Sequence, residues 1–164
     1  MKISGIMNAI TLAAIVGVGA YQIKDVQAEQ MVSAVSQEEK TCLQQNIFFE
    51  ARNQSTLGQV SVAWVTMNRV ENSRYPDTIC EVVWQRKQFS WTHDGKSDKP
   101  GDNILEQRAW EDAGIVAEVV LLDWARDESS PVGNAIMYHA DYVNPFWSAS
   151  YDRVTQIDSH IFYQ

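Results

Sequence analysis

The segment SQEEKTCLQQNIFFEAR, residues 36–52, carries the clearest structural signal in the sequence. Its first residue, Ser36, stands three positions before Glu39, which is a capping-box pattern at the start of a helix. Apolar residues then recur at i, i+4 spacing and give the segment one apolar face. These features predict a helix from about Gln37 to Arg52 that packs against a core.

The residues that follow predict more helices and then a change of period. Thr56-Leu57-Gly58-Gln59 resembles a second capping box, and the run after it is apolar on most faces, as in a central core helix. The tail alternates with the period of strands. We therefore expect one α+β domain, mostly helical with a small antiparallel β-sheet. The predicted elements are helices over 56–70, 76–84 and 103–126, a loop or small hairpin over 86–101, and strands over 135–139 and 157–163.

Length and charge exclude several classes of protein. The 164 residues suffice for one domain with a core but not for two large ones. Thirteen Lys and Arg against 21 Asp and Glu give a net charge of −8, which repels phosphate polymers and anionic lipid. No partnership with nucleic acid is expected, and no low-complexity tract indicates disorder.

Residues 1–28 have the composition of an export segment. Lys2 precedes an apolar stretch, and Val26-Gln27-Ala28 offers small residues where a signal peptidase cleaves. The alternatives are an uncleaved membrane anchor and an intracellular apolar helix. We expect a polar leader over 29–39 and the globular domain over 40–164. The protein would then be exported to the periplasm or cell wall and contact membrane only through its first residues.

Export changes what the two cysteines imply. Cys42 and Cys80 both follow the export segment, and an oxidising compartment permits a disulfide between them. Two buried thiols are the alternative. A cysteine nucleophile is disfavoured because neither residue has a histidine or a cation beside it in sequence.

Glu50 is the most informative acidic residue. It ends the first predicted helix among Ile, Phe and Ala residues, a setting that disfavours its charged form and raises its pKa. The helix dipole acts in the same direction at a C-terminus. A carboxyl that stays protonated near neutral pH can act as a general acid. The alternative is a structural Glu50 that pairs with Arg52 or faces solvent.

Aromatic and polar residues cluster outside the predicted helices. Flat rings beside amide and hydroxyl groups suit a pyranose, which has an apolar face and a rim of hydroxyls. The alternative is that tryptophans fill the core, which we expect for Trp64 and Trp110. The candidate substrate-binding residues are Gln88, Phe89, Ser90, Trp91, Tyr138, His139 and Trp147.

Metal and nucleotide chemistry have little local support. His93, His139, His160 and Asp94 could supply zinc ligands, but no two histidines stand at i, i+4 and no HExxH occurs. No GxSxG, Walker loop or GxGxxG is present either. We expect no metal and no cofactor.

An ordered series of short motifs resembles one family, the SleB-type cell wall hydrolases known from spore cortex-lytic enzymes and from proteobacterial and phage relatives. The resemblance covers roughly residues 40–163. It implies a lysozyme-like α+β fold and action on the glycan strands of peptidoglycan. Separately, we expect the protein to be a monomer. The motifs are Asn46–Arg52, Gly58–Ala63, Met67–Val70, Tyr75–Ile79, Val82–Gln85, Gln88–Ser90, Tyr138-His139, Trp147 and Asp158–Tyr163.

The resemblance implies a role for three residues. Glu50 takes the place of the family's catalytic glutamate in its "EAR" signature, and Cys42 and Cys80 match an extra cysteine pair of proteobacterial members. The chain departs from the pattern at Asn53-Gln54, which replaces the usual Gly-Glu, and at Ile157–His160, which replaces "IG-H". Wall-binding repeats of the spore enzymes are absent, so ordinary peptidoglycan is the expected substrate.

A single implied carboxyl favours one mechanism. Hydrolysis of the usual pattern needs two carboxyls, whereas one suffices if the muramic C6 hydroxyl attacks its own C1 and leaves a 1,6-anhydro end. We therefore hypothesise lytic transglycosylation of the MurNAc-GlcNAc β-1,4 bond. The alternatives are lysozyme-type hydrolysis with Asp94, Asp141 or another acid, a non-catalytic glycan-binding module that uses Trp91, Tyr138 and Trp147, and an amidase or endopeptidase.

Overall fold

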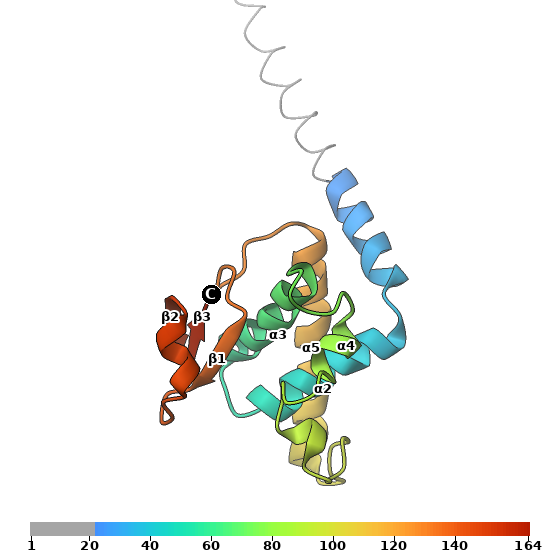
Figure 1. The fold of residues 1–164 in the computed structure, drawn as a ribbon. Coiled ribbons are helices and arrows are strands. Elements are labelled where there is room, and N and C mark those ends of the chain that lie inside the picture. Colours follow the sequence, from blue (N-terminus) through green and yellow to red (C-terminus); the bar gives the residue numbers. More distant parts are fainter. Residues whose placement is uncertain (1–21) are drawn as a thin grey trace, which may run out of the picture.

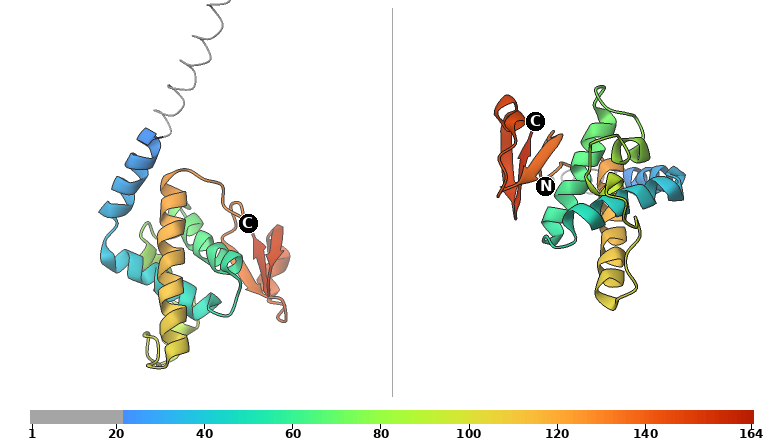
Figure 2. Two further views of the ribbon diagram at one scale, coloured as in Figure 1. Left: turned by 180° about the vertical axis from the view of Figure 1, so that it is seen from behind. Right: turned by 60° about the horizontal axis from the view of Figure 1, so that its bottom comes forward.

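A computed structural model describes residues 22–164, and its ribbon is drawn in Figure 1. Three strands form a sheet at one side of the molecule, and α3 lies between this sheet and the other helices (Figures 1 and 2). The elements, after a helical stretch over 22–34, are α2 (Gln37–Ala51), α3 (Thr56–Glu71), α4 (Ile79–Val83), the 3-10 helix η1 (Trp91–His93), α5 (Ile104–Ala125), β1 (Met137–Ala140), the 3-10 helix η2 (Phe146–Ser150), β2 (Arg153–Ile157) and β3 (His160–Tyr163).

Short polar side chains begin the long helices, as the sequence indicates. Ser36 accepts a hydrogen bond from the backbone N–H of Glu39 and so starts α2 where the capping box predicts. Asn103 accepts from two N–H groups in the first turn of α5, which confirms the predicted start of the longest helix. The capping box at Thr56 is misplaced by one residue, because Ser55 is the residue that caps α3.

The core forms where α2 packs against α3, α4 and α5. Both α2 and α3 are crossed by neighbours on several sides, and each contributes fully buried side chains. Trp64 is buried as expected, and Trp110 packs against the same core. The largest fully buried side chains are Phe48, Phe162, Leu43, Ile47, Met67, Leu121, Val62, Val65, Val82, Val83, Val120 and Val132.

The sheet is antiparallel with the strand order β1-β3-β2. Met137 pairs with Tyr163, and Ile157 pairs with His160. The single strand predicted over 157–163 is wrong, because the chain reverses between β2 and β3. Asp158 has φ of 49° there, a left-handed conformation that a non-glycine residue rarely adopts. The loop over 86–101 contains one 3-10 turn and, among the described residues, no hairpin.

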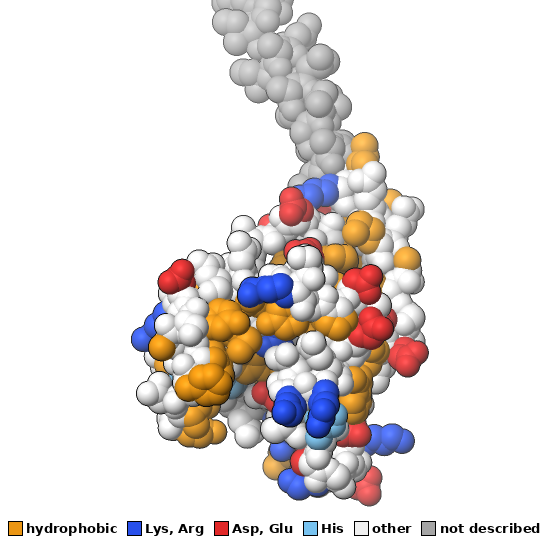
Figure 3. Space-filling model, in the orientation of Figure 1, with side chains coloured by type: hydrophobic (Ala, Val, Ile, Leu, Met, Phe, Trp, Pro, Cys, Tyr) orange, Lys and Arg blue, Asp and Glu red, His pale blue; other side chains and the backbone are white. Residues whose placement is uncertain are grey.

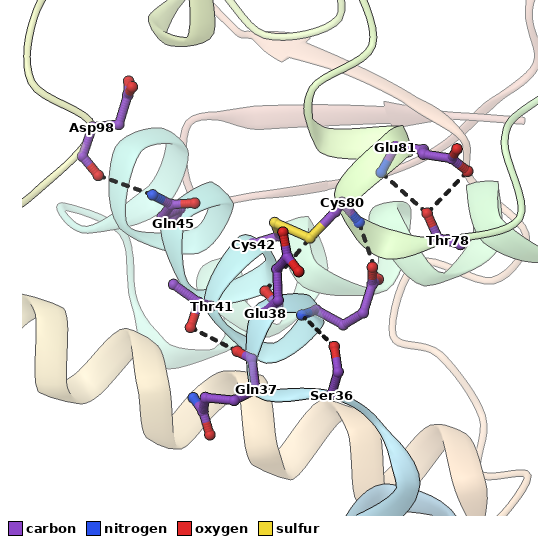
Figure 4. Close-up of a disulfide and its surroundings, with 11 residues drawn as sticks. Ser36, Gln37, Glu38, Thr41, Cys42, Gln45, Thr78, Cys80, Glu81 and Asp98 are labelled. Atoms are coloured by element: carbon purple, nitrogen blue, oxygen red, sulfur yellow. Dashed lines mark hydrogen bonds between the residues drawn. A yellow bond between two sulfur atoms is a disulfide. The ribbon is translucent and has the colours of Figure 1, made fainter.

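The disulfide between Cys42 and Cys80 is confirmed, and it joins α2 to α4 (Figure 4). The two Cα atoms are 5.2 Å apart. The carboxylate of Glu39 accepts a hydrogen bond from the backbone N–H of Cys80 at 3.1 Å, so a second contact links the same two helices. Both interactions restrain α2, which carries Glu50 in its last turn.

The segment before α2 packs onto the domain. Ala28 is fully buried, Val32 belongs to the core, and Asp25 forms a 2.9 Å ion pair with Arg126. Within the described residues, no helix has the length and apolarity needed to cross a membrane. Most of the predicted export segment, residues 1–21, lies outside the described part of the chain.

Candidate active site

Glu50 occupies the last turn of α2 and is half-buried. The disulfide and the packed face of α2 hold the helix in place, so the carboxyl projects from a rigid element. The surface is hollowed between the sheet and the helices, with hydrophobic side chains gathered over the sheet (Figure 3). A rigid helix end beside such a hollow can present an acid to a bound chain.

Tyr138 of β1 meets Glu50 across 88 positions of sequence. Its phenol donates a hydrogen bond to Oε2 of Glu50 at 2.9 Å. The Tyr138 ring packs against His160 and Phe162, with centroid separations of 5.2 and 5.7 Å. Burial and the neighbouring Glu50 raise the pKa of Tyr138 well above its ordinary value, so its hydroxyl remains a neutral donor.

The pKa of Glu50 is raised above its ordinary value of 4.5. Burial is the largest cause, because a carboxylate loses hydration in a half-enclosed site. The hydrogen bond from Tyr138 and the positive charge of Arg69 both act in the opposite direction. Glu50 therefore keeps its proton to higher pH than an exposed glutamate and still has two groups that stabilise its anion.

Glu50 lines a pocket of about 190 Å³ that five parts of the chain build. Helices α2 and α3 form one wall, the loop after α4 another, and β1 and η2 close the site. Among the pocket's lining residues, Glu50 is the one carboxyl. The lining residues are Glu50, Arg69, Lys87, Gln88, Phe89, Met137, Tyr138 and Trp147.

Arg69, Lys87 and Met137 line the pocket although the sequence analysis assigned them no role, and Arg69 is the buried charge among them. It is 2% exposed, and its Nε donates to the carbonyl oxygen of Ile136 at 2.7 Å. The amide oxygen of Gln88, turned toward the guanidinium, accepts from Nη1 and Nη2 at 3.0 and 2.9 Å. A lone arginine in the otherwise apolar run of α3 was the available signal.

The structure brings four of the seven predicted substrate-binding residues into the Glu50 pocket, namely Gln88, Phe89, Tyr138 and Trp147. Ser90 is exposed next to them. Trp91, in contrast, is 8% exposed, stacks on Phe49 with ring centroids 4.7 Å apart, and borders a separate pocket of about 240 Å³. Its ring therefore packs mainly against protein.

His139 supports the pocket from behind. Its Nδ1 donates to the carbonyl of Ala140 at 2.8 Å, which leaves Nε2 to accept from the hydroxyl of Tyr163 at 2.9 Å. The imidazole also packs edge-on against Trp147, with centroids 5.5 Å apart. His139 thus fixes the position of a ring that lines the site.

The other candidate acids lie outside the Glu50 pocket. Asp94 lines the separate pocket beside Trp91 and pairs with Lys96 at 3.4 Å. The backbone N–H of Lys96 is the main cause that lowers the pKa of Asp94. Asp141 is exposed at the end of β1. A larger pocket of about 330 Å³ near Glu71 and Trp124 contains none of the predicted site residues.

The described residues bring together no group of three or more His, Cys, Asp or Glu side chains that could hold a metal ion. His160 illustrates why. It is 7% exposed in β3, and burial lowers its pKa below the ordinary value. Its closest aromatic neighbours are Tyr138 and Phe162, so its surroundings are those of a packed core side chain.

The fold, mostly helical with a small antiparallel sheet, is of the lysozyme-like class. In this chain it places one carboxyl, that of Glu50, in a pocket lined by aromatic and amide groups. More particularly, the chain belongs to the cell wall hydrolase family, whose model matches residues 53–163. The matched range begins just after Glu50. This finding confirms the resemblance to SleB-type hydrolases.

Relatives and solved structures agree with this assignment. The chain is 30% identical over 117 residues to a spore cortex-lytic enzyme of Oceanobacillus iheyensis, a match that covers 71% of this chain and 38% of the relative. A Bacillus cereus spore cortex-lytic enzyme is 28% identical over 117 residues, 71% of this chain and 40% of the relative. The chain thus spans about two fifths of the length of these curated relatives.

The solved structures are catalytic domains. The chain resembles that of the Bacillus cereus SleB protein with a TM-score of 0.57 and 27% identity, over 80% of this chain and 94% of that domain. It resembles the catalytic domain of the germination-specific lytic transglycosylase SleB from Bacillus anthracis with a TM-score of 0.61 and 27% identity, over 80% and 98%. The similarity is therefore to the catalytic part of the longer relatives.

Proposed function

We propose that this protein cleaves the MurNAc-GlcNAc β-1,4 bond of peptidoglycan as a lytic transglycosylase, with Glu50 as its single general acid and base. One observation carries the proposal. Glu50 is the one carboxyl among the residues that line the pocket, and its pKa is raised. A second carboxyl placed for ordinary hydrolysis would stand about 5–9.5 Å from the first.

In the first step, Glu50 donates its proton to the glycosidic oxygen. The bond between that oxygen and C1 of the muramic sugar breaks, the GlcNAc hydroxyl leaves, and positive charge develops at C1. The pocket favours this step because burial raises the pKa of Glu50 and so favours its protonated form. After transfer, the carboxylate accepts the hydrogen bond from Tyr138.

In the second step, the C6 hydroxyl of the same muramic sugar attacks C1. Its proton passes to the Glu50 carboxylate, which restores the acid and leaves a 1,6-anhydro end. No water is consumed, so no second carboxyl is needed to activate one. One residue can serve both steps because its surroundings have opposing effects on its proton. Burial favours the protonated acid, whereas the hydrogen bond from Tyr138 and the positive charge of Arg69 favour the carboxylate.

Sugar binding is assigned to the residues around this carboxyl. Trp147 provides aromatic surface in the pocket, buried Phe89 forms part of its wall, and Gln88 adds an amide at the rim. His139 orients Trp147. Ser90 and Trp91 remain candidates for neighbouring sugar positions.

The proposed site of action is the periplasm or cell wall. The disulfide supports it, because such bonds persist in oxidising compartments. We propose that residues 1–28 direct export or anchor the chain, and that the protein acts as a monomer.

The test is incubation of purified sacculi with the protein, followed by mass analysis of soluble fragments. Wild-type protein should release disaccharide-peptides whose muramic end is one water lighter than a reducing end. Glu50→Gln should release none, while Glu38→Gln, the same change at an exposed position of α2, should retain wild-type activity. Sacculus binding without release would show a glycan-binding module, and cut peptides would show an amidase or endopeptidase.

A further inference from the structure

Arg69 is a buried cation whose bonds all go to neutral groups. Its guanidinium donates to the carbonyl of Ile136 and to the amide oxygen of Gln88. The guanidinium carbon lies 5.4 Å from the ring centroid of Phe89 and 5.5 Å from that of Tyr75. Within the described range, no carboxylate forms an ion pair with it.

Such an arrangement is costly for a fold. A buried charge without a counter-ion loses hydration that neutral acceptors replace only in part. An aliphatic side chain, like those of Val62 and Val65 on the same helix, would pack here without that cost. The guanidinium is also held by two elements, the strand region at Ile136 and the loop at Gln88, so its position is determined. Its uncompensated charge is therefore available to a group that becomes negative.

We propose that Arg69 is the positioning residue of the Glu50 site, a fixed buried charge that stabilises the Glu50 carboxylate in the interval between its two proton transfers. This inference rests on the proposed acid and base role of Glu50. Arg69 touches neither the sugar nor the reacting atoms in this proposal. It acts through Glu50, and Gln88 holds it in place.

Four titratable or charged groups surround Glu50, and they differ in how strongly they can act. Tyr138 faces it from β1 and supplies a neutral hydrogen bond. Lys87 lines the pocket from the loop after α4, and Arg52 follows Glu50 at the end of α2, but both side chains are exposed. Solvent screens their charges far more than the charge of buried Arg69.

Arginine suits this position because it keeps its charge. Burial lowers the pKa of Arg69 from its ordinary value, while the nearby Glu50 raises it again. An arginine in a protein nevertheless stays protonated. It cannot accept the proton that Glu50 releases, so the proton passes only between Glu50 and the sugar oxygens.

The test follows the titration of Glu50 itself, so it does not depend on enzymatic activity. Protein labelled with ¹³C at the glutamate carboxyl carbons is titrated by NMR, and the Glu50 signal is assigned by its loss in Glu50→Gln. Arg69→Met should move the Glu50 midpoint to higher pH, and Arg69→Lys, which keeps the charge, should restore it toward the wild-type value. Lys87→Met is the matched control for an exposed charge and should move the midpoint much less.

The activity of the same variants provides a second readout. Arg69→Met should lose about tenfold or more in kcat, because the anion it leaves unstabilised forms in the reaction. Arg69→Lys should recover part of this loss. A merely structural Arg69 would lower thermal stability in both variants without moving the Glu50 midpoint, and that result overturns the proposal. An equal shift in Lys87→Met and Arg69→Met also overturns it.

Gln88→Glu keeps the proposal testable if Arg69→Met does not fold. The new carboxylate would replace the amide oxygen 2.9 Å from the guanidinium and neutralise its charge while Arg69 stays in place. The Glu50 midpoint should then rise, and an unchanged midpoint overturns the proposal. If the midpoint shifts as expected but wild-type protein releases no anhydro fragments, the proposed function fails while the coupling of Arg69 to Glu50 stands.

Discussion

Replacing Tyr138 by Phe removes one oxygen atom and tests how Glu50 is controlled. The lost bond is the 2.9 Å donation from the phenol to Oε2 of Glu50. The ring contacts with His160 and Phe162 remain, so the sheet should keep its packing. The perturbation is therefore confined to the proton balance of the site.

The magnitude follows from the type of hydrogen bond. A bond to a charged group contributes about 1.5–3 kcal/mol, or roughly 10- to 150-fold in the ratio of ionised to protonated carboxyl. Because Tyr138 lowers the pKa of Glu50, its removal raises that pKa further. A general acid loses activity as pH rises through its pKa, so the alkaline limb of kcat/KM should move to higher pH. The value of kcat should fall, since the anion is less stable.

The assay is the rate of soluble fragment release from sacculi, measured across pH for wild type, Tyr138→Phe and Tyr142→Phe. Tyr142 is 85% exposed, and its hydroxyl serves as the control for the same chemical change away from the site. An alkaline limb that stays in place in Tyr138→Phe, or moves to lower pH, would show that Tyr138 does not stabilise the Glu50 carboxylate.

Three further predictions concern stability. Glu50→Gln should stabilise the fold at pH 8 but not at pH 4. The pKa of Glu50 is raised in the folded state above its ordinary value of 4.5, so the wild-type protein loses stability as pH rises from 4.5 through the folded-state pKa. An equal gain in melting temperature at both pH values would contradict this. Serine at both Cys42 and Cys80 should lower the free energy of unfolding in urea by about 4 kcal/mol, because the bridge closes a separation of 38 residues; a loss below about 1 kcal/mol would contradict it. Gly58→Ala should destabilise by about 1–3 kcal/mol, because its Cβ would lie 2.5 Å from Oδ2 of Asp158; the cost should shrink in the Asp158→Ala background, and purely additive losses would argue against the contact.

Local signals predicted the three long helices well, whereas the helix predicted over 76–84 is shorter and spans only Ile79–Val83. The start of α2 depends on Ser36 and its near neighbours, and the start of α5 depends on Asn103, so a short window contains the needed information. The apolar face of α2 likewise identified a buried helix before any partner was known. The candidate disulfide between Cys42 and Cys80 rested on compartment and resemblance, and the structure contains it.

Features that depend on distant contacts were harder to predict. The turn between β2 and β3 contains Asp158, not glycine, in a left-handed conformation, so its sequence resembles a continuous strand. The structure shows what compensates the strain. Asp158 accepts hydrogen bonds from the backbone N–H and hydroxyl of Ser55 at 2.8 and 2.6 Å. The two hydrogen bonds from Ser55 hold the pKa of Asp158 below its ordinary value.

The two departures from the family pattern meet at this turn. Gln54, where the family has Glu, accepts hydrogen bonds through its side-chain oxygen from the N–H and hydroxyl of Ser159 at 3.3 and 3.0 Å. Gln54 and Ser159 are 105 positions apart in the sequence, yet the fold brings them into contact. Only the fold could reveal that they form one interaction.

The candidate site was predicted in its residue types and only partly in its geometry. Glu50 was identified from its apolar surroundings and its motif. Its link to Tyr138 depends on the pairing of β1 with β3, which places residue 138 opposite Phe162. Trp91 packs in the core and not at the rim of the Glu50 pocket. The sequence could not decide between these two positions, because both suit an aromatic residue beside a loop.

In the proposed mechanism one carboxyl performs both proton transfers and no water enters the product. Digestion of sacculi in H₂¹⁸O, followed by mass spectrometry of the soluble fragments, tests it directly. Transglycosylation should leave muramic ends that lack one water and carry no ¹⁸O. Reducing ends that contain one ¹⁸O atom would show hydrolysis and contradict it.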